Sequence, residues 1–370
     1  MSADQTLVRV ALSDRSYDIE IGADRLASAA GFVTARRRCT HAVVIADQSV
    51  ADTHAAKVAE SFRQAGIRID LFKVPSGEGN KTLASAERMW NAMVAAKADR
   101  KTIVVAVGGG VIGDLAGFVA ATYTRGVSFV QIPTTLLAHV DSSVGGKVGV
   151  NLPQAKNMLG AFWQPLAVLI DTNTLKTLPE REYRSGLAEV VKYGVILDAD
   201  FFGYLEEHAA ALNERDPTTL RHVIARCCQL KAEVVAADER EETGLRAVLN
   251  YGHTFCHAIE AVAGYGQFLH GEAVSLGMMC AARLAERLGR IGPELRQRQW
   301  QLLTALRLPV NLPAFDNSAL IAAMQHDKKV EYGQLRFILP SRMGHVELVG
   351  NVPAQEVQAT LMDLQIANPA

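Results

Sequence analysis

The first half of the chain alternates short apolar runs with longer segments whose apolar positions recur at helical spacing. Short, nearly continuous apolar runs are typical of strands buried on both faces of a sheet. Two earlier stretches, 7–12 and 17–22, alternate polar and apolar residues and predict a hairpin. Helices are expected at 50–66 and 82–97, and their alternation with strands predicts an α/β fold with a doubly wound, mostly parallel sheet. The buried strands are expected at 41–47, 68–75, 101–107, 127–133 and 167–172.

The pattern changes near Leu178, and from there almost every segment has helical periodicity. One strand-like run, 335–340, interrupts it near the end. Since no repeat or low-complexity linker separates the halves, we expect two closely packed domains with a site in the cleft between them. The first is an α/β domain at 1–177, and the second an all-helical domain at 178–370. The helices of the second half are expected at 179–197, 199–211, 217–239, 246–263, 271–289, 293–306 and 317–330.

Composition mainly excludes classes of binding partner and location. With 49% hydrophobic residues and a formal net charge of −1, the 370-residue chain can bury a large core but has no charge surplus that would favour a nucleic-acid or membrane partner. The amino-terminal stretch lacks the apolar run of a signal peptide, and no run is long enough for a membrane span. Five cysteines without a CxxC spacing indicate reduced, buried thiols, so a cytoplasmic location is expected.

A glycine-rich turn follows one of the buried strands. Gly108, Gly110 and Gly113 match G-x-G-x-x-G between that strand and a helical segment, the context in which the motif holds a dinucleotide pyrophosphate. A tight turn with close helix–strand packing is the alternative, but the context favours the cofactor. The acidic residue expected roughly 20 positions later is absent. Asp47, at the end of an earlier strand, is the candidate ribose contact, and it favours NAD over NADP.

Histidines gather in the second half of the chain. His253 and His257 are four positions apart on a predicted helix, so both imidazoles share one face, as in metal-binding helices. His270 opens a later helix, and Glu189 lies in an apolar helix where a carboxylate is costly unless paired or bound to metal. Glu272 is a further candidate, and two His with one Glu suit a catalytic zinc ion. Core histidines satisfied by hydrogen bonds are the alternative for any one of them, and spacing alone favours His253 and His257.

Several cationic and polar side chains stand among glycines and apolar residues. A polar, glycine-rich stretch between 139 and 165 has the length of a functional loop. Lys192 shares a helix face with Glu189, and Lys231 falls on an apolar helix face. Because Arg and Lys fix carboxylates and phosphates, these positions can hold an anionic substrate, although a solvated surface is the alternative for any single lysine. The candidates are Asp141, Lys147, Lys156, Asn157, Lys192, Lys231, Arg246, Asn250, Lys328 and Lys329.

Taken together, these segments resemble the 3-dehydroquinate synthase family from about Asp47 to Lys329. The resemblance implies an NAD-binding α/β domain and a helical domain that holds one divalent metal ion, zinc or cobalt. It implies conversion of 3-deoxy-D-arabino-heptulosonate 7-phosphate to 3-dehydroquinate and phosphate, a step of the shikimate pathway to aromatic amino acids. The implied route is transient oxidation by NAD, phosphate elimination, re-reduction and intramolecular aldol closure. The motifs are GGGVIGDLAGFVAATYTRG, QIPTTLLAHVDSSVGGKVGVN, SGLAEVVKYG, LNYGHTFCHAIE, HGEAVSLGM and HDKK.

The resemblance also implies roles for single residues. It makes Glu189, His253 and His270 the metal ligands, in place of the spacing-based choice of His257. Arg125 resembles an arginine that the family lends to the neighbouring subunit, which implies a homodimer. The implied catalytic residues are Asp141, Lys147, Lys192 and His257, and the implied substrate-binding residues are Arg125, Asn157, Lys231, Arg246, Asn250 and Lys328. The implied NAD-binding residues are Asp47, Ser76, Gly77, Glu78, Gly79, Asn80, Lys81, Gly110, Val111, Ile112, Gly113, Asp114, Thr134, Thr135, Lys147, Lys156, Thr174, Leu175, Lys176 and Thr177.

Three other functions are compatible with parts of this pattern. A related sugar-phosphate cyclase, such as a valiolone or scyllo-inosose synthase, would share the glycines and metal ligands but differ around the substrate carboxylate. A metal-dependent polyol dehydrogenase would release NADH stoichiometrically. A non-enzymatic metabolite-binding regulator would be expected to have lost metal ligands. The presence of Lys231, Arg246, Asn250 and His257 favours the dehydroquinate reaction.

Overall fold

A seven-stranded sheet forms the centre of the first part of the chain in the computed structural model, which describes residues 5–264, 266–325 and 335–366. Its order is β1-β2-β9-β6-β5-β3-β4, and every neighbouring pair is parallel except β1 with β2, the hairpin expected from the sequence. The α/β class and the mostly parallel sheet are thus confirmed. The strands are β1 Gln5–Val10, β2 Tyr17–Gly22, β3 His41–Asp47, β4 Arg68–Val74, β5 Ile103–Gly108, β6 Phe129–Pro133 and β9 Ala167–Asp171.

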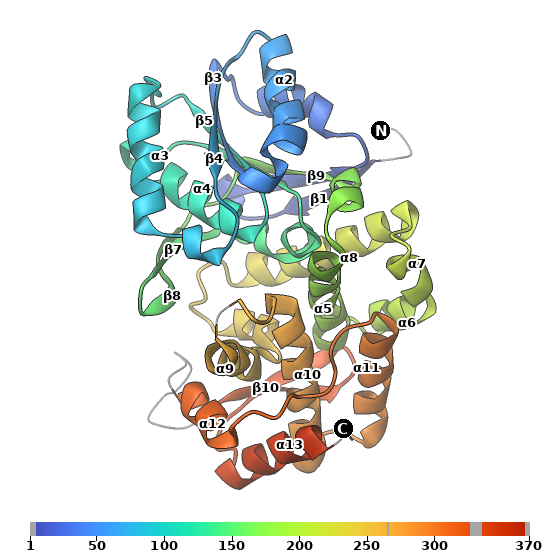
Figure 1. Cartoon of the computed structure of the whole chain (residues 1–370). Coiled ribbons are helices and arrows are strands. Elements are labelled where there is room, and N and C mark those ends of the chain that lie inside the picture. The colour runs from blue at the N-terminus through green and yellow to red at the C-terminus, as the bar shows by residue number, and fades with distance from the viewer. Residues whose placement is uncertain (1–4, 265, 326–334, 367–370) are drawn as a thin grey trace. The chain divides into compact units, whose positions relative to one another are not determined.

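Helices cover both faces of this sheet. Along β3, Val44 packs in one apolar cluster with Phe62 of α2 (Ala56–Gln64), while Val43 packs in another with Met89 of α3 (Leu83–Ala95). Figure 1 shows α2 and α3 on opposite sides of the strands. The short α1 (Ala29–Thr34) joins the α2 face, and α4 (Gly110–Thr122) the α3 face. Because the chain passes from β3 to β4 on one side and then to β5 on the other, the carboxyl ends of β3 and β5 form a topological switch point, where such sheets bind ligands.

The glycine-rich stretch expected to be a loop forms a second hairpin. Strands β7 (Lys147–Leu152) and β8 (Ala155–Phe162) pair antiparallel, with Gly149 opposite Gly160. A Cβ on Gly149 would lie 2.5 Å from the carbonyl oxygen of Leu159, so the two backbones approach more closely than side chains allow. The composition suggested a loop because glycine is rare in strands, whereas here glycine permits the pairing.

Helices dominate the second part of the chain, as expected, but two antiparallel strands interrupt them. The strands are β10 (Phe337–Arg342), near the predicted run, and β11 (His345–Val349), which was not predicted. The predicted helix 246–263 is divided at Gly252, which has a φ of +77° and separates the short turn η9 (Leu245–Asn250) from α9. The helices are α5 Glu180–Leu197, α6 Ala199–Glu207, α7 Ala209–Asn213, α9 His253–Ala263, α10 His270–Arg287, α11 Pro293–Ala305, α12 Asn317–Gln325 and α13 Ala354–Ile366.

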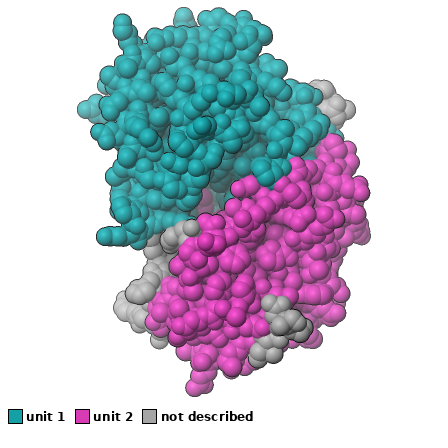
Figure 2. Space-filling view, in the orientation of Figure 1, with its two compact units in different colours: residues 1–179, 220–240 teal, residues 180–219, 241–370 magenta. Residues whose placement is uncertain are grey.

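Contacts divide the chain into two compact units, shown in different colours in Figure 2. The first comprises 1–179 together with 220–240, and the second 180–219 together with 241–370. Most of α8 (Pro217–Ala237) therefore belongs to the α/β unit, whereas the sequence analysis assigned it to the helical domain. The reason is side-chain packing: on α8 the Cys228 thiol donates to the carbonyl oxygen of His139. Among the described residues, no helix is long and apolar enough to cross a membrane.

Candidate active site

Three potential metal ligands converge within the second unit. Glu189 of α5 is 1% exposed, and its Oε1 lies 3.7 Å from Nε2 of His253 and 3.7 Å from Nε2 of His270. The ligand atoms of these three residues all lie within 4.8 Å of one another. Two imidazoles and one carboxylate around an open position are the donor set of catalytic zinc sites, and cobalt accepts the same donors. The geometry thus brings together the residues implied by the resemblance. His257 is not part of this cluster, although its ring centroid lies 5.7 Å from that of His253.

Close helix packing places these ligands. A Cβ on Gly271 would lie 1.8 Å from the carbonyl oxygen of Ser185 on α5, and a Cβ on Gly277 would lie 2.2 Å from the carbonyl oxygen of Gly252. Both glycines belong to α10, so the absence of side chains lets α10 approach α5 and the start of α9 at backbone distance. His253 and His270 are each the first residue of their helix. Their side chains are therefore fixed by helix ends that packing holds in place.

Each histidine of the cluster has a neighbour at its second ring nitrogen. His253 Nδ1 lies 3.1 Å from the carbonyl oxygen of Tyr251, which fixes Nδ1 as the donor and leaves Nε2 toward Glu189. His270 Nδ1 lies 3.5 Å from Glu260 Oε1 and 3.9 Å from Cys256 Sγ. Burial lowers the pKa of His270, but Cys256, Glu260 and Glu189 together outweigh burial, and the pKa lies well above its ordinary value.

Three cationic or polar candidates of the second unit lie near the cluster in sequence, and the two cations are buried. Lys192, 2% exposed, is ion-paired through Nζ to Glu189 Oε2, so one carboxylate is shared between an ammonium group and two imidazoles. Arg246, 3% exposed, lies on η9 with its Nε 3.6 Å from Glu241 Oε1. Asn250 ends the same turn. Buried cations of this kind are suited to fixing a small anion rather than to solvation. Lys328 and Lys329 lie outside the described residues.

At the switch point of the first unit, Asp47 and the glycine turn are neighbours. Asp47 Oδ1 accepts hydrogen bonds from Ser49 N at 2.8 Å and from Ser76 Oγ, so the loop that begins at Ser76 is tied to the end of β3. A Cβ on Gly108 would lie 3.2 Å from Cβ of Asp47, and one on Gly110 would lie 2.9 Å from Ser142 Oγ. Close packing therefore explains part of the glycine motif, while Gly110 also opens α4, whose N-terminus can hold an anion.

A lysine between two carboxylates lies beside this turn. Lys81 Nζ is 3.0 Å from Asp114 Oδ2 and 3.2 Å from Glu78 Oε1. Burial opposes the charge on Lys81, but the two carboxylates raise its pKa, so it remains an ammonium group. Asn151, which the sequence analysis did not select, donates to Glu78 Oε1 at 2.7 Å. Its position on β7 carried no signal, because a backbone bridge to a distant segment brings it there: Asn151 N donates to the Lys81 carbonyl oxygen at 2.8 Å, next to the turn of Glu78.

Lys231 of α8 meets Asp141 within the same unit. Its Nζ donates to the Asp141 carbonyl oxygen at 2.8 Å and lies 2.9 Å from Oδ1, so two predicted residues far apart in sequence are in contact.

The other candidates of this unit differ in exposure. Lys147 and Asn157 are exposed on the β7–β8 hairpin, and Lys156 is partly buried. The remaining NAD candidates follow strands β6 and β9. Thr134, Thr174 and Leu175 are buried, and Thr135 is partly buried. Lys176 and Thr177 are exposed.

Arg125 is held in an unusual backbone conformation. Thr124 and Arg125 have φ values of +49° and +70°, which non-glycine residues rarely adopt, and Gly126 follows at +118°. A Cβ on Gly126 would lie 2.5 Å from the Trp163 ring, so this glycine lets the turn pass under the indole. The strained turn leaves Arg125 exposed, and among the described residues Arg125 makes no ion pair.

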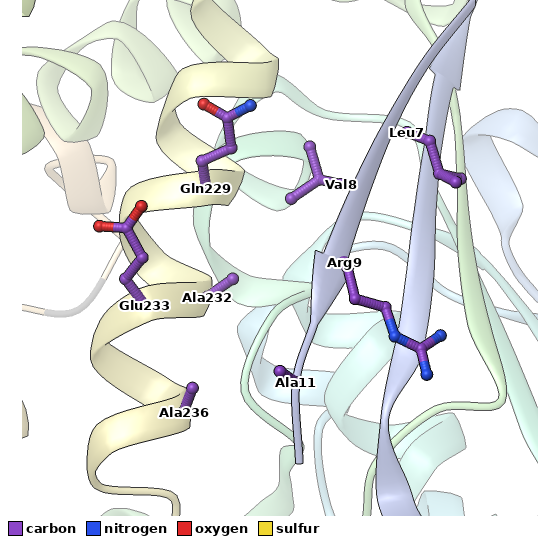
Figure 3. A pocket seen from close by; sticks show the side chains of 8 residues that line it. All are labelled: Leu7, Val8, Arg9, Ala11, Gln229, Ala232, Glu233 and Ala236. Atoms are coloured by element: carbon purple, nitrogen blue, oxygen red, sulfur yellow. The ribbon is translucent and has the colours of Figure 1, made fainter. Parts of the chain in front are cut away.

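A separate hollow of about 220 Å³ lies between β1 and α8 of the first unit (Figure 3). Arg9 and Glu233 are the charged side chains of its lining, and the rest is apolar apart from Gln229. It contains none of the residues that the sequence analysis selected. The hollow therefore has no part in the site assembled here.

Comparisons with known proteins identify the family to which the chain belongs. Residues 71–185 match the family described as 3-dehydroquinate synthase N-terminal, and residues 186–330 the family described as 3-dehydroquinate synthase C-terminal. A 3-dehydroquinate synthase of Rhodopirellula baltica is 53% identical over 361 residues, which cover 96% of both chains.

Two solved structures of other cyclases are also similar. A 2-deoxy-scyllo-inosose synthase complexed with carbaglucose-6-phosphate, NAD+ and Co2+ has a TM-score of 0.88 at 29% identity, over 97% of this chain and 100% of that one. A 2-epi-5-epi-valiolone synthase from Streptomyces hygroscopicus subsp. jinggangensis 5008, with NAD+ and Zn2+ bound, has a TM-score of 0.88 at 30% identity, over 97% and 99%. With both halves of its sequence matched and a relative more than half identical along nearly its whole length, the chain belongs to the 3-dehydroquinate synthase family.

Proposed function

We propose that this chain converts 3-deoxy-D-arabino-heptulosonate 7-phosphate to 3-dehydroquinate and phosphate, with NAD and one divalent metal ion as cofactors. The observation that carries the proposal is the convergence of Glu189, His253 and His270 within 4.8 Å in a chain that belongs to this family. A regulator that had kept only the fold would not need this donor set at the buried junction of three helices.

The residues of the cluster fit a divalent metal ion. Glu189 supplies one negative charge, and His253 and His270 can supply nitrogen ligands, His270 after release of the proton that its raised pKa favours without a metal ion. When bound, the ion would supply Lewis acidity that stabilises negative charge on a substrate oxygen. Lys192 adds a positive charge at the other oxygen of Glu189, so it is placed to attract and orient an anionic substrate beside the ligands.

The carboxyl edge of the sheet fits NAD. Asp47 offers a carboxylate to a ribose, and α4 begins at Gly110 with its positive, N-terminal end available to a pyrophosphate. NAD when bound would supply a hydride acceptor in the first half of the reaction and a hydride donor in the second. Lys81 remains charged between Glu78 and Asp114, which fixes its ammonium group at this edge.

Cationic and amide side chains are suited to the substrate's two anionic groups. We assign Arg246 and Lys231 to the carboxylate and Asn157, Asn250, Lys328 and Arg125 to the phosphate. Arg246 can bind a carboxylate through two N–H groups, and Lys231 is held in a single orientation by Asp141. His257, beside His253, is assigned to proton transfer at the substrate.

The exposed Arg125 supports a shared active site in a homodimer. Its strained turn keeps the guanidinium outside the packed core and, among the described residues, without an ion-pair partner of its own unit. We propose that it reaches the phosphate bound by a second copy of the chain. A cytoplasmic location is proposed from the five cysteines, which are all buried and form no disulfide with one another, as in a reducing compartment.

The test is phosphate release from the heptulosonate phosphate with NAD far below the substrate concentration. Many turnovers per NAD with no net absorbance change at 340 nm are expected. Stoichiometric NADH would indicate a polyol dehydrogenase and contradict the proposal.

The second candidate is a cyclase whose sugar-phosphate substrate lacks the carboxylate, and the likeness to the scyllo-inosose and valiolone synthases favours it. Turnover of sedoheptulose 7-phosphate or glucose 6-phosphate in preference to the heptulosonate would establish it.

A further inference from the structure

Glu260 occupies a buried position next to the ligand cluster. It is the last residue of the motif LNYGHTFCHAIE, but it has no role in the proposed reaction. It is 9% exposed on α9, three positions after His257. His253, Cys256, His257 and Glu260 follow one another at helical spacing, so they share one face of α9. A carboxylate on a buried helix face is costly unless a partner compensates its charge.

His270 is one such partner. Its two ring nitrogens face two carboxylates from different helices: Nε2 lies 3.7 Å from Glu189 Oε1, and Nδ1 lies 3.5 Å from Glu260 Oε1. The ring therefore spans from the ligand cluster to α9. The Cys256 thiol also lies near Nδ1, at 3.9 Å, and it is a much weaker acceptor than a carboxylate. An approach of about 0.5 Å would bring Nδ1 and the carboxylate to ordinary N–H···O distance.

We propose that Glu260 is a positioning residue that accepts a hydrogen bond from Nδ1–H of His270 and thereby directs Nε2 toward the metal ion. The inference rests on the metal site of the proposed function. Metal-bound histidines usually donate their second N–H to a carboxylate or carbonyl, which fixes the tautomer and the ring orientation. His253 has such a partner in the Tyr251 carbonyl oxygen at 3.1 Å, and Glu260 gives His270 the corresponding one.

Cys256, Glu260 and His270 also lie close enough together to hold an ion of their own. This alternative is disfavoured because His270 would have to bind one ion through each nitrogen, which requires a fully deprotonated imidazole. Burial also raises the pKa of the Cys256 thiol, which opposes the thiolate that a metal ion would need. A positioning role needs neither change.

The test compares metal binding by the wild type, Glu260→Gln and Cys256→Ser, all without substrate or NAD. Apo-protein is titrated with Zn2+ against a chromophoric chelator, and the visible spectrum of the Co2+-loaded protein is recorded. We expect Glu260→Gln to lose 10–100-fold in Zn2+ affinity, roughly the effect of removing an outer carboxylate, and to shift the Co2+ bands. Cys256→Ser, which alters the same ring's surroundings but keeps the carboxylate, should bind within about threefold of the wild type.

If Glu260→Gln binds Zn2+ as tightly as the wild type and has the same Co2+ spectrum, the inference is overturned. It is also overturned if each wild-type chain binds two Zn2+ ions and Glu260→Gln binds only one. If Glu260→Gln does not fold, long-range 1H–15N spectra of the zinc-loaded wild type decide. They should show a proton on Nδ1 and metal at Nε2 of His270, and the reverse would reject the role of Glu260. A wild type that binds no metal would instead reject the metal site and the proposed function.

Discussion

The packing of α10 against the start of α9 gives a sharp prediction about a residue that touches no ligand. In Gly277→Ala the new Cβ would lie 2.2 Å from the Gly252 carbonyl oxygen and 3.0 Å from the backbone nitrogen of Cys256. Both are backbone atoms, so no side-chain rotation relieves the clash. Reaching an ordinary contact of 3.4 Å requires the two segments to separate by about 1.2 Å.

That separation should act on both stability and metal binding. Overpacking of this kind costs about 1–3 kcal/mol, and about 2 kcal/mol corresponds to a melting point lower by roughly 4–8 °C for a unit of this size. Because His253 and His270 begin the two displaced helices, the ligands would move by more than the ~0.5 Å that a preorganised site tolerates. Zinc affinity should therefore fall at least about tenfold.

The matched control is Gly203→Ala in α6 of the same unit, where a Cβ meets nothing within 4 Å. Replacing a mid-helix glycine by alanine there should stabilise the protein by about 0.5–1 kcal/mol and leave zinc binding unchanged. Thermal unfolding followed by circular dichroism, with and without zinc, measures the first effect, and chelator competition the second. Gly277→Ala with wild-type melting and wild-type zinc affinity would show that the two segments are not packed at this distance.

Three further predictions concern the proposed site. Elemental analysis should find no metal ion in His270→Ala, whereas His257→Ala should keep its metal ion and turn over slowly. The opposite result would make His257, the residue favoured by spacing, the ligand. Arg246→Ala should raise the KM for the heptulosonate phosphate by about 10–100-fold, because a charged contact to the substrate carboxylate is lost. The KM for NAD should change little, and an equal rise in both KM values would argue that Arg246 does not bind the carboxylate. Arg125→Ala should be nearly inactive, and mixing it with inactive Lys192→Ala should restore activity after subunit exchange. Confirmed exchange without restored activity, or an active monomer in sedimentation, would reject the shared site.

Several features were determined by the sequence alone. Strand β3 could be predicted because a run buried on both faces has to be continuously apolar, and the turn at Gly108–Gly113 because a strand followed by glycines and a helix has few other conformations. The family followed from long motifs around the site. Spacing along one helix, however, favoured His257 over His270, because periodicity reports only which residues share a face of that helix.

Tertiary structure decided what depends on contacts between distant segments. His270 joins Glu189 and His253 only because Gly271 and Gly277 let α10 approach its neighbours at backbone distance. The β7–β8 hairpin forms despite its glycines because two backbones pair there, and α8 groups with the α/β unit because Cys228 and Lys231 contact it. The sequence placed Glu260 in a motif and on the histidine face of its helix but indicated no role for it, because that role depends on the ring of His270, which another helix supplies. Local pattern fixes the conformation of a segment, whereas the partner of a buried polar group is set by close packing, which no local pattern encodes.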